Sequence, residues 1–204
     1  ISAWVNFSDF DTSTPTVISK ITPGELIGYG IEKNSIHNKL SFWVGDGTAF
    51  REITSNELSE NTWYYVVCTN DGSTSKLYID GSLVSSGESG YPAGPTGDLK
   101  IGIHSTESQS FRYWDGFIDE LAVWNVALAE SQIQSYMSTP PTGNETGLVG
   151  YWNFNEGTGT TLTDQTSNSN DGTIVGATWS TDVPGPVTYY VATDGSDDND
   201  GSEN

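Results

Sequence analysis

One stretch of this chain, Trp114–Ile133, constrains the possible folds more than any other. It reads WDGFIDELAVWNVALAESQI, and hydrophobic residues alternate with period two over residues 117–124. This alternation predicts a β-strand in which Asp119 shares one face with Leu121 while Glu120 points to the other face. A carboxylate on a core-facing row is costly unless it is paired, hydrogen-bonded or bound to a metal. We therefore expect Asp119 to have a partner elsewhere in the chain.

The composition favours an all-β fold. Aromatic residues make up 12% of the 204 positions, and short β-branched and aromatic runs are broken by Asn, Asp, Ser and 23 glycines. A helical spacing of apolar residues occurs at Ala129, Ile133, Tyr136 and Met137, just before Pro140. The sequence thus predicts a two-sheet antiparallel sandwich with one short surface helix.

The expected strands follow from alternation and turn chemistry. They lie at residues 1–7, 16–21, 25–31, 39–44, 62–69, 76–86, 98–103 and 117–124, and two further strands are expected within residues 147–179. Asp80-Gly81 predicts a type I′ hairpin turn within residues 76–86. A half-buried first strand, a polar connection before Thr62 and a buried Cys68 are also expected.

The charge balance excludes some partners. Seven basic and 27 acidic residues leave a net charge of −20, which repels nucleic acid and anionic membrane surfaces. No apolar run is long enough to span a bilayer, so we expect no membrane insertion. Because the chain begins inside a strand-like pattern, we also expect one or more N-terminal strands to be missing.

A loop rich in oxygen ligands is a candidate metal site. Asp164, Asn168, Asn170 and Asp171 offer the carboxylate and amide oxygens that calcium prefers. If this loop folded over the strand that carries Asp119, a calcium ion would compensate that carboxylate. The alternative is an Asx-rich turn whose side chains cap their own backbone, and the sequence leaves both open.

Three residues are candidates for ligand binding. Tyr91 lies in the Gly, Pro and Ser-rich loop 87–97, which is either an ordinary connection or a rim loop carrying a binding aromatic. His104 and Tyr113 flank a second polar loop.

Catalysis has little support in the sequence. Neither a Gly-x-Ser-x-Gly elbow nor a His-Glu-x-x-His pair is present. Glycosidases need two carboxylates flanking one sugar bond, whereas Asp119 and Glu120 are expected to face opposite ways. The sequence therefore predicts a protein that is not an enzyme.

Several motifs together resemble a known family. ISAWV at the start, NTWYYVV, KLYIDGSLVSSG, DLKIG and WDGFIDELAVWNVALAESQI resemble the concanavalin A-like, laminin G-like jelly-roll modules of bacterial secreted proteins, over about residues 1–137. The resemblance implies a jelly roll and a non-catalytic module that binds carbohydrate or protein. It also implies a structural calcium near Asp119, with Asp164 and Asp171 matching the family's acidic loop.

The C-terminal part leaves two organisations open. Residues 147–179 resemble a segment that precedes the ISAWV strand in many members, and they either complete the sandwich of a 1–183 domain or exchange with a neighbouring chain. Residues 184–204 read as a linker followed by the start of another domain, similar to the opening strand of a right-handed parallel β-helix.

These features give two functional hypotheses. The first is a calcium-stabilised carbohydrate-binding or adhesion module of a larger secreted or cell-surface protein, whose partner is a glycan or a surface protein. The alternative is a structural repeat or filament subunit that exchanges strands with other copies of itself.

Overall fold

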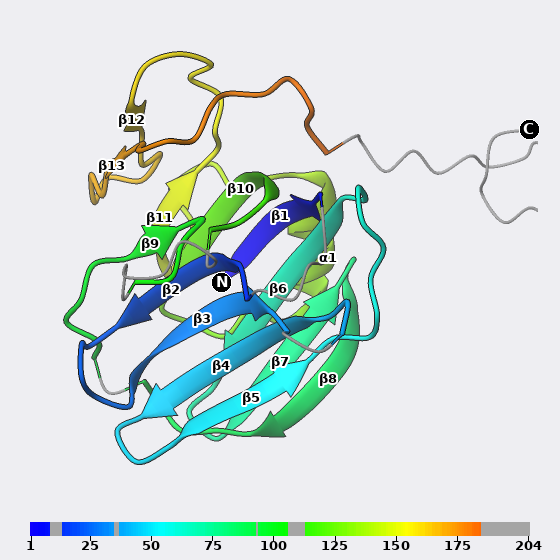
Figure 1. Cartoon of the computed structure of the whole chain (residues 1–204), viewed down its shortest axis with the longest axis vertical. Coiled ribbons are helices and arrows are strands. Elements are labelled where there is room, and N and C mark those ends of the chain that lie inside the picture. Colours follow the sequence, from blue (N-terminus) through cyan, green and yellow to red (C-terminus); the bar gives the residue numbers. More distant parts are fainter. Residues whose placement is uncertain (9–13, 35–36, 93, 106–112, 185–204) are drawn as a thin grey trace, which may run out of the picture.

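Two antiparallel β-sheets face each other in this computed structural model, and one short helix covers the outer side of one sheet (Figure 1). The structure describes residues 1–8, 14–34, 37–92, 94–105 and 113–184. The prediction of an all-β, two-sheet antiparallel jelly-roll sandwich with one short surface helix is confirmed.

The sheets have six and five strands. In spatial order the first contains β11 (Leu148–Trp152), β10 (Gly116–Trp124), β1 (Ser2–Phe7), β6 (Tyr64–Asn70), β7 (Thr74–Ile79) and β8 (Ser82–Glu88). The second contains β5 (Phe50–Thr54), β4 (Leu40–Asp46), β3 (Ile27–Lys33), β2 (Thr16–Ile21) and β9 (Lys100–Ile101). The remaining elements are the pair β12 (Thr161–Leu162) and β13 (Gly172–Thr173) and the helix α1 (Glu130–Ser138). No helix in these described parts is long and apolar enough to cross a membrane.

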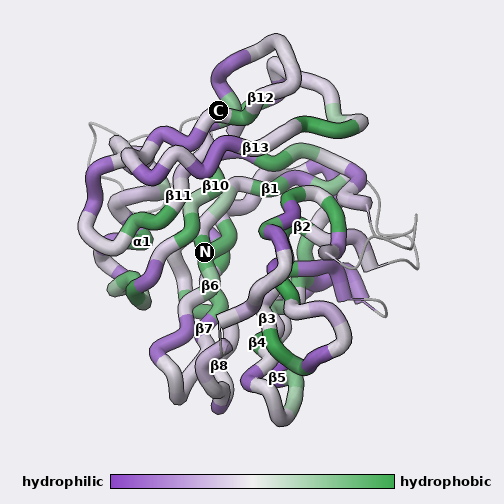
Figure 2. The backbone as a smooth tube through the Cα atoms, turned by 90° about the vertical axis from the view of Figure 1, so that its left-hand side faces the viewer, coloured by the Kyte–Doolittle hydropathy of each residue, from purple (hydrophilic) through white to green (hydrophobic). Residues whose placement is uncertain are grey.

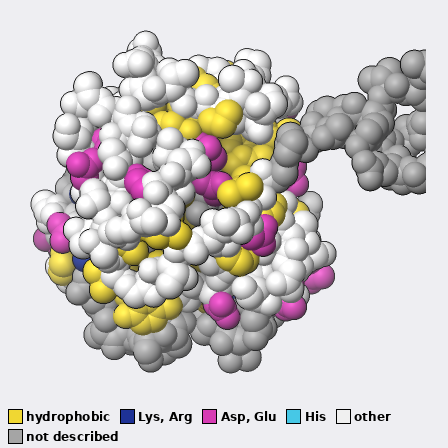
Figure 3. All heavy atoms as spheres, turned by 90° about the horizontal axis from the view of Figure 1, so that it is seen from above, with side chains coloured by type: hydrophobic (Ala, Val, Ile, Leu, Met, Phe, Trp, Pro, Cys, Tyr) yellow, Lys and Arg dark blue, Asp and Glu magenta, His cyan; other side chains and the backbone are white. Residues whose placement is uncertain are grey.

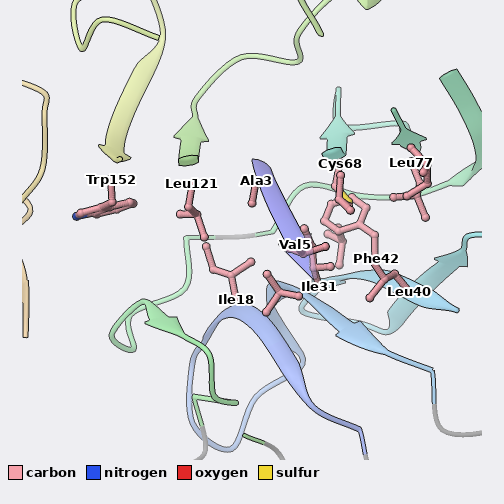
Figure 4. Close-up of a cluster of buried hydrophobic side chains, with 14 of the residues drawn as sticks. Ala3, Val5, Ile18, Ile31, Leu40, Phe42, Cys68, Leu77, Leu121 and Trp152 are labelled. Carbon is pink, nitrogen blue, oxygen red and sulfur yellow. The ribbon is translucent and has the colours of Figure 1, made fainter. Parts of the chain in front are cut away.

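The core lies between the two sheets. Figure 2 shows β6, β7 and β8 in one layer and β3, β4 and β5 in the other. In Figure 4 the side chains of the two layers point toward one another: Ala3, Val5, Cys68, Leu77 and Leu121 from the first, and Ile18, Ile31, Leu40 and Phe42 from the second. Cys68 is buried as expected, and burial raises the pKa of its thiol to about 12, so it is a core residue rather than a reactive thiol.

Strand β1 is buried on both faces, which corrects the expectation of a half-buried strand. Val5 faces the inter-sheet core, while Trp4 faces outward and packs with Leu128 and the fully buried Ile133 of α1. The helix therefore covers a surface that alternation alone would leave to solvent.

The edge strand β5 was not predicted. Its residues Phe50 to Glu52 are exposed, and β4 is its only partner in the sheet. Because an edge strand buries little, its sequence lacks the alternation that reveals central strands. The Asp80-Gly81 hairpin is confirmed, with φ of 48° and 75° at the two turn residues.

A β-bulge in β10 changes which residues share a face. Trp4 pairs with Asp119 and Ser2 with Ala122, so one more residue lies on β10 than on β1 between these pairs. Glu120, at φ 50°, is part of this bulge. Leu121 consequently enters the inter-sheet core, whereas Asp119 lies on the outer face beside Trp4. The prediction that Asp119 and Leu121 share a face is wrong.

Residues 147–179 pack within the same chain. Strand β11 pairs with β10, with Leu121 opposite Trp152, and both Trp152 and Leu162 belong to the inter-sheet core. This is the arrangement expected if the segment completes the sandwich. Exchange between copies stays a prediction, and so does the start of a β-helix domain, because residues 185–204 lie outside the described residues.

Candidate functional site

The loop predicted to bind calcium is held by its own hydrogen bonds. Asp164, buried against β11, accepts bonds from the backbone N–H groups of Tyr151 (3.0 Å), Thr166 (2.9 Å) and Asn170 (2.9 Å) and from the Thr166 hydroxyl (2.9 Å). Burial acts to raise the pKa of Asp164, but these donors outweigh it and lower the pKa below its ordinary value. Both carboxylate oxygens are thus already occupied.

The same loop covers the exposed edge of β11. The side-chain amides of Asn168 and Asn170 donate to the carbonyl oxygen of Val149, at 3.0 and 2.9 Å. The backbone N–H of Gln165 donates to the carbonyl of Tyr151 at 2.7 Å. The loop therefore satisfies the backbone groups that an edge strand would otherwise present to another strand.

These contacts do not fit a calcium site made of all five predicted ligands. Asp171 accepts the backbone N–H of Asp164 at 2.9 Å, and the carboxylate of Asp119 accepts the N–H of Glu120 at 2.9 Å, outside the loop network. Within the described ranges no three or more His, Cys, Asp or Glu side chains form a group that could hold a metal ion. Calcium binding stays a prediction, and the Asx-turn alternative accounts for the loop as it stands.

Asp119 and Glu120 lie on the same side of the sheet. The phenol of Tyr151 donates to Glu120, and Tyr151 packs on the outer face with Ala122. Desolvation raises the pKa of Asp119 to about 6 and also raises that of Glu120. The expectation that the two carboxylates face opposite ways is wrong, because the bulge inserts Glu120 between Asp119 and the core-facing Leu121.

The three predicted ligand residues are not brought together. The ring of His104 packs on Trp43 with 6.1 Å between ring centroids, and His104 is buried. Tyr113 is 55% exposed and Tyr91 is 66% exposed. Of the three, Tyr91 is the one that packs beside a described cleft.

That cleft opens where the two sheets meet at one end of the sandwich. It is a polar depression, largely open to solvent, with a volume of about 450 Å³. One wall comes from β4 and β5, and the other from the β6–β7 turn and the end of β8, strands that lie at the lower end of Figure 1. The lining residues include Asp46, Arg51, Gly72, Ser73, Glu88 and Ser89.

Tyr91 packs directly on the β6–β7 turn. A Cβ at Gly72 would lie 2.0 Å from the Tyr91 ring, and Gly72 has φ of 92°, so both space and backbone conformation require glycine there. The side-chain amide of Asn70 holds the loop that carries Tyr91, donating to Ser89 Oγ (2.9 Å) and to the carbonyl of Gly90 (3.1 Å). One side of the ring is thus fixed by protein while much of it remains exposed.

The opposite wall is charged. Asp46 accepts hydrogen bonds from the Thr48 hydroxyl and from the N–H groups of Thr48 and Ala49, and these lower its pKa to about 2. Arg51 Nε lies 3.7 Å from Asp46 Oδ2. The carboxylate of Asp46 also lies against Gly90, where a Cβ would be 2.8 Å from Oδ2. The loop that carries Tyr91 therefore passes close to the carboxylate of Asp46.

Sequence reasoning missed every residue that lines the cleft and selected only Tyr91, which packs on Gly72 at its rim. Asp46 and Arg51 lie in the consecutive strands β4 and β5, whereas Glu88 lies much later in the chain, in β8, and nothing in their local patterns indicates a shared site. The one signal was the Asp-Gly dipeptide at residues 46–47 and 71–72, which predicts turns at this end of the sheets.

Comparison with known proteins places the fold in a family. The family model described as the concanavalin A-like lectin/glucanases superfamily matches residues 1–134. A search of curated proteins finds no match.

Solved structures share the fold at low sequence identity. A candidate carbohydrate-binding protein from Bacteroides ovatus is 22% identical with a TM-score of 0.66, over 84% of this chain and 50% of that chain. Domain 4 of an extracellular arabinanase from Geobacillus stearothermophilus, in complex with arabinotriose, is 19% identical with a TM-score of 0.53, over 66% and 63%. The CBM40 of the Ruminococcus gnavus IT-sialidase, bound to α2,3 sialyllactose, is 9% identical with a TM-score of 0.52, over 66% and 78%. The chain thus spans half the length of the Bacteroides protein.

Proposed function

This chain belongs to the concanavalin A-like lectin/glucanase superfamily, and from that premise we propose that it is a non-catalytic carbohydrate-binding module of a larger extracellular or cell-surface protein. The solved structures that share its fold include modules whose own titles name carbohydrate ligands. Such similarity supports the class of function without identifying the sugar.

The observation that carries the proposal is the exposed Tyr91 ring at the rim of a polar cleft. A sugar ring presents an apolar face and a rim of hydroxyl groups, so its binding site combines an aromatic surface with nearby hydrogen-bonding groups. Tyr91 provides the aromatic surface, and Asp46, Arg51 and Ser89 provide acceptors and donors. This pairing favours the cleft over His104, which is buried.

The other acidic pair does not line this cleft. Asp119 and Glu120 lie on the outer face of the six-stranded sheet, against Tyr151 and Trp4. Nothing in their contacts provides two carboxylates on either side of a bound sugar, as glycoside hydrolysis requires. We therefore propose binding rather than catalysis.

Self-assembly by strand exchange has weaker support. The edge of β11 is already covered by the loop around Asp164, as the bonds to Val149 and Tyr151 show. The proposal includes adhesion to a surface glycoprotein, because the module would bind such a partner through the glycan that the partner carries.

A glycan array followed by calorimetric titration tests the proposal. Tyr91→Ala is expected to weaken binding at least about tenfold, equivalent to about 1.4 kcal/mol, because it removes the stacking surface. Tyr113→Ala is the control: it removes a ring of similar exposure, 55% against 66% for Tyr91, that lies before β10 rather than in the loop after β8, and it should leave affinity unchanged. Absence of binding to every glycan, or equal loss in both variants, would contradict the proposal.

A further inference from the structure

We propose that the cleft beside Tyr91 selects uncharged glycans and rejects saccharides that carry carboxylates or sulfates. The inference rests on the proposed function and adds the class of ligand. It follows from the side chains that form the two walls of the cleft, independently of which sugar is bound.

Acidic groups outnumber basic ones in the cleft. Asp46 and Glu88 line it together with Arg51, the one basic residue among its lining residues. The guanidinium of Arg51 is already close to a carboxylate, with Nε 3.7 Å from Asp46 Oδ2. A third carboxylate, Asp71, lies in the turn next to Gly72 and Ser73. The three carboxylates outnumber Arg51 and Lys76, the two described basic residues whose charges act on Asp46 and Asp71. An anionic saccharide would therefore meet a net negative surface.

Neutral sugar hydroxyls match the same groups well. Each hydroxyl can donate to a carboxylate oxygen of Asp46 or Glu88 and accept from the guanidinium of Arg51. The hydroxyl oxygens of Ser73 and Ser89, whose protons are donated to Asp71 and to the carbonyl of Gly90, add acceptors along the cleft. Hydrogen bonds to charged partners are the stronger kind, so an uncharged ligand gains from the charges that repel an anion.

The negative charge of the cleft persists over a wide pH range. Hydrogen bonds from Thr48 and Ala49 keep the pKa of Asp46 at about 2. Bonds from the backbone and hydroxyl of Ser73 and from the N–H of Thr74 likewise lower the pKa of Asp71. The carboxylates of Asp46 and Asp71 therefore stay charged at neutral and mildly acidic pH.

Binding to matched pairs of glycans tests the inference on the full chain. Suitable probes are lactose with α2,3-sialyllactose, and galactan oligosaccharides with oligogalacturonates of equal length, within an array that pairs each neutral glycan with an acidic counterpart. In each pair, we expect the neutral glycan to bind with at least tenfold higher affinity than its acidic counterpart at low salt. The ratio should fall as salt screens the charges.

A charge reversal in the cleft provides the specific readout. Glu88→Lys should narrow the neutral-to-acidic affinity ratio at least tenfold, because it removes one negative charge from the cleft and adds one positive charge. Glu57→Lys makes the same change at another exposed position that does not line the cleft, and the ratio should stay unchanged. Circular dichroism of both variants verifies that they are folded.

The outcomes separate the inference from the function on which it rests. If acidic members of the pairs bind as well as or better than the neutral ones and Tyr91→Ala abolishes that binding, the chain is a glycan-binding module and the inference is wrong. An equal effect of Glu88→Lys and Glu57→Lys would also overturn it. If no glycan binds the folded protein, the proposed function itself fails.

Discussion

The carboxylate of Asp164 accepts a 3.0 Å hydrogen bond from the backbone N–H of Tyr151 and thereby ties an acidic loop to the edge of β11. The same carboxylate accepts three further bonds from Thr166 and Asn170. The sequence predicts Asp164 as a metal ligand, but in the structure its carboxylate accepts hydrogen bonds that hold the backbone of the loop.

Replacing Asp164 by Ala should destabilise the fold by about 3 kcal/mol. The change leaves the N–H groups of Tyr151, Thr166 and Asn170 without their acceptor in a buried setting. Chemical denaturation measures the loss. The control Asp171→Ala removes one hydrogen bond, the one from the N–H of Asp164, and should lower the free energy of unfolding by about 1 kcal/mol or less. If both variants lost the same stability, Asp164 would not be the residue that organises the loop.

Removal of divalent cations should leave the melting temperature unchanged. Calcium stabilisation, predicted from the sequence, would instead lower the melting temperature on addition of EDTA and raise it on addition of Ca²⁺. We expect no shift because the oxygens of Asp164 are already bonded to donors within the protein. A calcium-dependent shift that Asp164→Asn or Asp171→Asn abolishes would restore the metal site.

The stability gained by replacing Asp119 with Asn should depend on pH. Desolvation raises the pKa of the folded-state carboxyl from 3.8 to about 6. The folded protein therefore binds a proton more readily than the unfolded chain does. The stability that this proton contributes is fully present below about pH 3.8 and is lost as the pH rises through about 6.

Asp119→Asn removes this dependence and keeps an acceptor for the N–H of Glu120. Relative to the original chain, the variant should be more stable at pH 7.5, by on the order of 2 kcal/mol, with the difference vanishing toward pH 4. Urea denaturation at several pH values measures it. A difference that does not change with pH would show that Asp119 is not desolvated.

The bulge at Glu120 should reverse the usual order of Ala and Gly. Its φ of 50° lies in the left-handed region that favours glycine. Both Glu120→Gly and Glu120→Ala lose the bond from Tyr151, so their difference isolates the backbone, and the Gly variant should be more stable by about 1 kcal/mol. At Lys76, inside β7, the Ala variant should be the more stable one. If the Ala variant were more stable than the Gly variant at both positions, the backbone at Glu120 would not be strained.

Local chemistry made most strands predictable. Alternating apolar residues identified the segments of β1, β2, β4 and β6, and Asp80-Gly81 identified the hairpin, because each signal depends on neighbours a few residues apart. The edge strand β5 carried no such signal. The faces of β10 were assigned wrongly because one inserted residue reverses every side chain beyond it.

The candidate cleft was largely beyond prediction. Tyr91 was selected because it lies in a Gly and Pro-rich loop, but its neighbours Asp46 and Arg51 lie some forty residues earlier in the chain. Figure 3 shows acidic side chains spread over one face of the molecule, so acidity alone does not mark the site.

The sequence alone determined the fold class, the helix, the family and the acidic character of the protein, because these depend on composition and short-range periodicity. The tertiary structure decided the orientation of Asp119, the partners of Asp164 and the residues that surround Tyr91. Each of these depends on strand register and on the packing of segments distant in the chain. At such contacts, the burial of a carboxylate and the hydrogen-bond donors around it determine whether it binds backbone N–H groups, a metal ion or a ligand.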